Sequence, residues 1–128
     1  IMKQSTCGVF PSRAEGWNLE LLEMMSCGKP VITTNYSAHT EFCTQDNARL
    51  VEIDSMEDAY DGKWFNGEVG EWASLEGNAF DSLVNHMRSV YSEWQESRLL
   101  VNDSGIQTAI DFSWDRTAQK IKEAIGED

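Results

Sequence analysis

Positive charge is scarce in this 128-residue sequence, which has ten Lys and Arg residues against 22 Asp and Glu residues. The formal net charge of −12 disfavours attraction to nucleic acid and to anionic membranes, so we expect no nucleic-acid partner. Any phosphate bound here would need cations supplied from outside the segment. Long apolar runs are also missing: none approaches the roughly 18 residues that indicate a membrane-spanning helix, so none is expected.

Cysteine is limited to Cys7, Cys27 and Cys43. An odd number without paired spacing argues against a disulfide framework and for a reducing compartment, so we expect a cytoplasmic protein. Cys7 and Cys27 stand in apolar runs and are expected to be buried small hydrophobic residues. No spacing of Cys and His suits zinc, and we predict neither a metal site nor a cofactor.

Residues 7–34 predict a strand, a loop, a helix and a second strand. Cys7 to Phe10 is a short apolar run stopped by Pro11, which is typical of a buried strand. Val31 to Thr34 is β-branched throughout, which is typical of a strand covered on both faces in a parallel sheet. Asn18 is a natural N-cap for the helix between them.

That helix should end at Gly28, because glycine is the usual residue just past a helix end. Its apolar residues at helical spacing predict one buried face. The face comprises Leu19, Leu22, Met25 and Ser26, with Leu21 and Met24 beside it.

Downstream, a helical turn is expected over Ala38–Phe42, with His39 exposed in it, and a third strand over Arg49–Ile53. Residues 54–74 have no clean period but are rich in aromatic residues and contain two Gly-based turn signals. We expect a long surface loop there, packed on itself or forming a wall against another domain.

Three helices are expected in the C-terminal half, over residues 80–94, 97–110 and 114–125, and Ser113 should cap the last of them. The first carries a strong apolar stripe that should face the core: Phe80, Leu83, Val84, Met87, Val90, Tyr91 and Trp94. The fold class is therefore α/β, a partial Rossmann-like domain of about three parallel strands with helices on both faces. Residues 1–128 form a single segment of one domain.

Two carboxylates, Glu15 and Glu23, flank the predicted helix start with seven residues between them. The backbone N–H groups of Gly16 to Leu19 should open toward the strand ends, where the helix dipole favours an anion such as phosphate. Carboxylates repel phosphate but accept strong hydrogen bonds from hydroxyls. A ligand with both phosphate and polyol parts, such as a nucleotide sugar, satisfies both conditions.

The run PSRAEGWNLELLEMMSCGKPVI resembles the signature of retaining glycosyltransferases of the group 1 type, which have the two-domain glycosyltransferase-B fold. The likeness is specific over Val9 to Glu41 and weaker to the C-terminus. It implies that this chain is the C-terminal part of the domain that binds the nucleotide-sugar donor. The acceptor domain and the diphosphate-binding cations would lie upstream, so we expect an incomplete segment that is inactive alone, with an unknown acceptor.

The resemblance also implies residue roles. Glu15 would contact the hydroxyls of the transferred sugar and act in catalysis. Backbone amides of Gly16, Trp17, Asn18 and Leu19 would bind the sugar and diphosphate, and Glu23 would bind the ribose. Asn18 stands where the family often has Gly, and its larger side chain would alter which sugar fits.

Two other interpretations stay open. The segment could bind a nucleotide sugar or phosphosugar without transferring it. It could also belong to a sugar-phosphate isomerase or epimerase, for which Glu15 and His39 are the candidate bases. A likeness of fold does not decide between these functions.

Overall fold

The centre of the protein is a small parallel sheet. A computed structural model describes residues 1–126. Strands β1 (Gly8–Phe10), β2 (Val31–Thr34) and β3 (Arg49–Val51) pair in parallel in the order β1-β2-β3. Gly8 lies opposite Val31, and Ile32 lies opposite Arg49. The predicted α/β class with three parallel strands is confirmed, and the central strand β2 is buried along its whole length.

Helix α1 (Leu19–Ser26) crosses from β1 to β2 and has the predicted ends. The Asn18 side chain caps its N-terminus by accepting a hydrogen bond from the N–H of Leu21. At the other end Gly28 has a φ of +68°, and its N–H donates to the carbonyl of Met25. The N–H of Lys29 donates to the carbonyl of Met24, which completes a Schellman motif.

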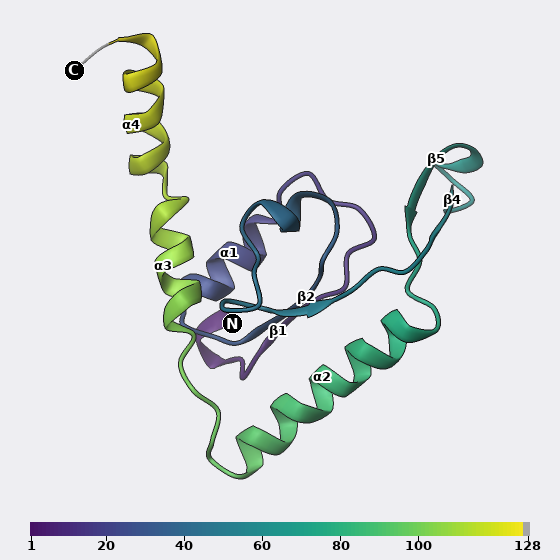
Figure 1. Cartoon of the computed structure of the whole chain (residues 1–128), viewed down its shortest axis with the longest axis horizontal. Helices are drawn as coiled ribbons and strands as arrows, with labels where there is room; N and C mark the ends of the chain where they lie inside the picture. The colour runs from purple at the N-terminus through teal and green to yellow at the C-terminus, as the bar shows by residue number, and fades with distance from the viewer. Residues whose placement is uncertain (127–128) are drawn as a thin grey trace.

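Helices cover both faces of the sheet, as predicted (Figure 1). On one face, α1 buries Leu21, Leu22, Met24 and Met25 against Val31 and Phe42. On the other face, α2 (Asn78–Gln95) packs Ala79 and Val90 against Ile32 and Val51. Neighbouring residues of β2 point to opposite faces, which is why Val31 and Ile32 join different clusters.

Residues 54–74 are not the irregular loop that we expected. They form an antiparallel hairpin of β4 (Met56–Tyr60) and β5 (Asn66–Ala73), which projects from the body (Figure 1). Most of its residues are exposed, so burial does not impose the alternating apolar pattern that marks a strand.

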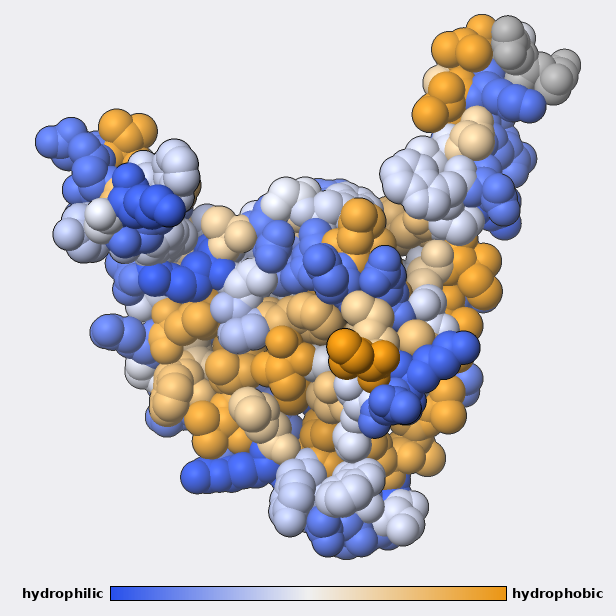
Figure 2. All heavy atoms as spheres, turned by 180° about the vertical axis from the view of Figure 1, so that it is seen from behind, coloured by the Kyte–Doolittle hydropathy of each residue, from blue (hydrophilic) through white to orange (hydrophobic). Residues whose placement is uncertain are grey.

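The expectation that the apolar stripe of α2 faces the core is wrong for most of its length. Val90 is buried, but Phe80, Met87, Tyr91 and Trp94 are about half exposed or more. Figure 2 shows hydrophobic residues spread over the body of the molecule, below its two projecting arms.

Two helices end the described chain. Helix α3 (Asp103–Asp111) begins later than expected because Asn102 caps it, and it packs beside α1. Helix α4 (Trp114–Ile125) is capped by Ser113 as predicted and extends away from the body (Figure 1). Short 3₁₀ helices, η1 (Met2–Gln4) and η2 (Ser37–Glu41), complete the elements. No helix among the described residues is long and apolar enough to span a membrane.

Candidate functional site

The loops that follow β1 and β2 are joined at the carboxyl end of the sheet. The Thr34 hydroxyl donates to the carbonyl of Ser12 over 2.7 Å. The Ser37 hydroxyl donates to the carbonyl of Glu15 over 2.7 Å and accepts from the N–H of Glu15 over 3.2 Å. Ser37 itself has a φ of +57°, which is uncommon for a residue other than glycine. These bonds hold the backbone of Glu15 beside the ends of two strands.

The Glu15 side chain is half-buried at this edge. The Ser12 hydroxyl donates to its Oε1 over 2.9 Å. Its Oε2 accepts no hydrogen bond from residues 1–126. One oxygen is thus oriented by the protein while the other can accept from a ligand hydroxyl. Glu15 is therefore held at the carboxyl end of the sheet with one oriented carboxylate oxygen.

The Asn18 side chain points into the protein. Its backbone is left-handed, with a φ of 71°, and its side chain is buried. The side chain caps α1 and lies 2.9 Å from Nε2 of His39. The expectation that the Asn18 side chain alters which sugar fits is therefore not supported, because the side chain points into the protein.

His39 is fully buried, so the expectation that it is exposed is wrong. Its Nδ1 lies 2.8 Å from the Thr33 hydroxyl and 3.1 Å from the carbonyl of Thr34. Because Asn18 accepts from Leu21 through its oxygen, its amide nitrogen faces Nε2 and donates to it. With Nε2 accepting, the proton of His39 lies on Nδ1, and the ring links the start of α1 to the end of β2.

The N–H groups of Gly16, Trp17, Asn18 and Leu19 are oriented by this network at the N-terminus of α1. Among the described residues none of these four groups donates to a protein acceptor. The Trp17 side chain turns away from them: its ring packs 5.2 Å from that of Phe42 and 5.5 Å from that of Phe112. The backbone of Trp17 is thus available while its side chain anchors the segment.

Glu23 lies on the exposed face of α1 together with Leu19 and Ser26. This corrects the predicted buried face, since Leu19 is 53% exposed and only the other four apolar residues are buried. Glu41, at the end of η2, is also exposed.

Arg13, the cationic side chain in the loop that carries Glu15, already contacts other protein groups. Arg13 forms an ion pair with Glu57, its Nε donates to the carbonyl of Ala73 over 2.9 Å, and its guanidinium lies 4.2 Å from the centre of the Trp72 ring. Within residues 1–126 no three His, Cys, Asp or Glu side chains cluster as a metal site would require. Phosphate bound at α1 would thus meet backbone N–H groups and the helix dipole before any side-chain cation of this segment.

A hollow of about 480 Å³ lies at the opposite end of the sheet, where β2 and β3 begin. Its lining includes Val31, Arg49 and Asn102. Ligands of open parallel sheets bind at the carboxyl ends of the strands, so this hollow is not the candidate site.

Sequence reasoning singled out Glu15, Glu23 and the amides of residues 16–19, but it missed Ser12, Ser37, Thr33 and the role of His39. Those residues act through contacts between loops that are distant in the sequence. The local signal was the position of Ser12 and Ser37, two and three residues after the ends of β1 and β2.

Comparison with known proteins gives one family. Residues 1–62 match the family described as "Glycosyl transferases group 1". This match covers β1, α1, β2, η2 and β3, and therefore every residue of the candidate site. A search of curated proteins finds no match to the chain.

Proposed function

Because residues 1–62 belong to the group 1 glycosyltransferases, we propose that this chain supplies part of the donor site of a sugar-transferring enzyme. The donor is a nucleotide-diphosphate sugar, and the transfer retains the configuration of the sugar. The observation that carries the proposal is the start of α1. Four N–H groups that meet no protein acceptor within residues 1–126 lie there beside Glu15, at the carboxyl end of the sheet.

The diphosphate lies against the N-terminus of α1. As the bond to the sugar breaks, negative charge grows on the leaving diphosphate, and N–H groups fixed in advance stabilise that charge without reorganising. The Asn18–His39 bond fixes the helix start from the protein side. Cations from outside this segment complete the neutralisation.

Glu15 contacts the transferred sugar through the carboxylate oxygen that Ser12 leaves free. Its negative charge favours the cation-like sugar of the transition state over the neutral ground state, which is the condition for catalysis. Glu23, farther along the exposed face of α1, accepts hydrogen bonds from the ribose. The exposed Leu19 provides an apolar contact between the two carboxylates.

The proposal is tested by NMR titration of the 128-residue chain with uridine, guanosine and adenosine diphosphates at millimolar concentration. We expect the amide signals of Gly16 to Leu19 to shift with at least one nucleotide. Glu23→Gln should weaken binding about ten- to a hundredfold, the equivalent of losing a charged hydrogen bond. Unchanged amide signals with all three nucleotides would refute the donor site.

Glu20→Gln is the matched control. Glu20 is an exposed acid on the same helix, three positions before Glu23, and it has no role in the proposed site. It also lies in the first turn of α1, so both substitutions reduce the negative charge near the helix start. An equal change in affinity for the two variants would show a general charge effect and would remove the ribose role of Glu23.

A further inference from the structure

The hairpin β4–β5 is attached to the loop that carries Glu15. The N–H of Ala73 donates to the carbonyl of Arg13 over 2.9 Å, and the Arg13 side chain returns a bond to the carbonyl of Ala73. The same side chain pairs with Glu57 and stacks on Trp72. The base of the hairpin is therefore fixed two residues from Glu15, at the edge of the candidate site.

The tip of the hairpin is well organised. One oxygen of Asp61 accepts from the N–H groups of Lys63, Trp64 and Phe65, at 2.8, 2.7 and 2.9 Å. These bonds close the turn, and because they favour the charged carboxylate they lower the pKa of Asp61. A turn ordered in this way can present side chains in fixed positions.

Aromatic rings occupy the hairpin and stay open to solvent. Trp64 is 78% exposed, Tyr60 64% and Phe65 49%. Phe65 packs edge to face against Trp72, with ring centres 5.7 Å apart, and the Arg13 guanidinium lies over the Trp72 ring. A row of rings therefore runs from the Glu15 loop toward the hairpin tip. Exposed aromatic groups of this kind usually mark a binding surface.

Unpaired carboxylates accompany the rings. Asp58 and Glu71 are direct partners across the two strands, an arrangement that costs stability because like charges face each other. The ion pairs among the described residues involve Glu57, Glu93 and Glu96, and none involves Asp58 or Glu71. A ligand that donates hydroxyl hydrogen bonds would relieve this repulsion.

From these contacts we infer that the hairpin binds a neutral saccharide, the part of the acceptor that reaches the donor site from the upstream domain; the inference rests on the proposed function. Rings present flat apolar surfaces to the C–H faces of a sugar, and carboxylates accept from its hydroxyls. Residues 56–73 hold five acids and one lysine, a net charge of −4 that repels phosphorylated and other anionic ligands. The hairpin would hold the acceptor at the edge of the donor site, which the Arg13 contacts adjoin.

The test is a titration of the 128-residue chain with neutral tri- to hexasaccharides of gluco, galacto and manno configuration, followed by NMR. We expect at least one to shift the signals of Trp64, Phe65 and Trp72. Trp64→Ala should weaken that binding about three- to tenfold. Trp94→Ala is the control, because Trp94 is a half-exposed tryptophan on α2, away from the hairpin. No response to any saccharide, or equal weakening in both variants, would overturn the inference.

Two further measurements separate the possible failures. If Trp64→Ala changes the sedimentation coefficient of a self-associating chain, the hairpin contacts a second copy instead, which refutes the saccharide role. Nucleotide titration of the same samples reports the donor site through the amides of Gly16 to Leu19. Nucleotide binding without saccharide binding refutes the hairpin alone, whereas saccharide binding without nucleotide binding refutes the donor site alone.

Discussion

Asn18 and His39 share a buried hydrogen bond of 2.9 Å that joins the start of α1 to the carboxyl end of the sheet. His39 continues the chain of contacts to Thr33 and to the carbonyl of Thr34 on β2. The Thr33 hydroxyl in turn donates to the carbonyl of Phe10 on β1. The N–H groups proposed to bind diphosphate are thus oriented by one buried polar network that spans two strands, η2 and α1.

Replacing His39 with Ala should destabilise the fold by about 2–4 kcal/mol, because it creates a cavity and leaves the buried Asn18 amide without an acceptor. Urea unfolding measures this loss. His86→Ala is the control: His86 is half-buried and bonds only the carbonyl of Leu50, so about 1 kcal/mol is expected. Equal losses would show that the network around His39 adds nothing beyond a single bond.

The two histidines should also differ in tautomer. His39 carries its proton on Nδ1, whereas Nε2 of His86 faces the carbonyl of Leu50 and must donate to it. Long-range ¹⁵N–¹H spectra at neutral pH distinguish the two forms. Finding the proton of His39 on Nε2 would contradict the assigned direction of the Asn18 bond.

Substitutions of Asn18 should separate its backbone role from its side-chain role. Asn18 has a φ of 71°, which costs an alanine roughly 1–2 kcal/mol but costs glycine little. Both Asn18→Ala and Asn18→Gly lose the cap and the bond to His39, so Asn18→Ala should be the less stable by about 1 kcal/mol or more in urea unfolding. Equal stability would mean that the left-handed backbone of residue 18 relaxes when its side chain is removed.

Local patterns predicted the parts of the fold that short-range chemistry determines. Strand β2 is β-branched, Asn18 and Gly28 cap α1, and Ser113 caps α4, and all of these were confirmed. The positions of Glu15 and the N–H groups followed from the order of strand, loop and helix. Their roles stay predictions.

Contacts between distant segments could not be predicted in the same way. His39 is buried because α1 and β2 both present it with polar partners, and nothing in its own neighbours signals this. The hairpin was missed because its strands are mostly exposed and polar. The apolar stripe of α2 predicted the helix correctly but did not predict how much of the stripe is buried. Periodicity shows which residues share a face of a helix, and it does not show what covers that face.

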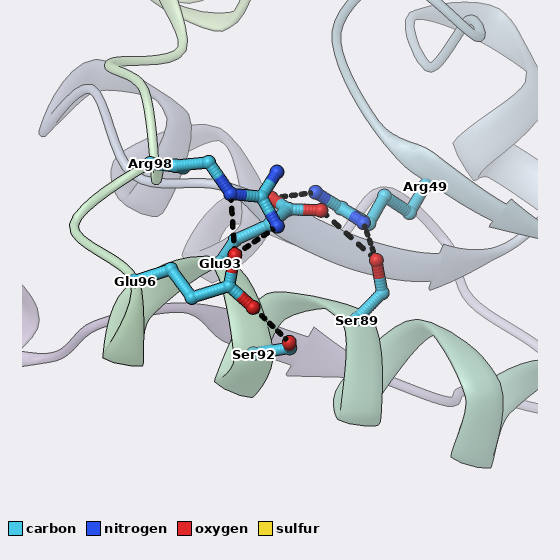
Figure 3. A network of polar contacts seen from close by, with 6 residues as sticks. All are labelled: Arg49, Ser89, Ser92, Glu93, Glu96 and Arg98. Carbon is cyan, nitrogen blue, oxygen red and sulfur yellow. Dashed lines mark hydrogen bonds and ion pairs between the residues drawn. The ribbon is translucent and has the colours of Figure 1, made fainter.

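The network that docks α2 on β3 should make stability depend on pH (Figure 3). Arg49 donates to Glu93 over 2.6 Å and to Ser89 over 3.1 Å, and the Arg49 bond lowers the pKa of Glu93. A carboxyl whose pKa is lowered by folding contributes stability above its unfolded pKa and loses that contribution as the pH falls through its folded pKa. The pH range in which Glu93 loses its contribution to stability therefore begins just below the ordinary Glu pKa of about 4.3 and extends to lower pH.

Glu93→Gln should accordingly cost about 0.5–1 kcal/mol at pH 7 and almost nothing at the lowest pH at which the chain still folds. Urea unfolding of both proteins across this range measures the difference. Glu96→Gln is the control within the same network: Glu96 pairs with Arg98, and its pKa is also lowered, chiefly by that bond. Both partners of this second pair are more than half exposed, so solvent screens it and its loss should leave stability unchanged. A Glu93→Gln effect that stays constant down to acidic pH would show that the side chain stabilises α2 by packing, with no contribution from its charge.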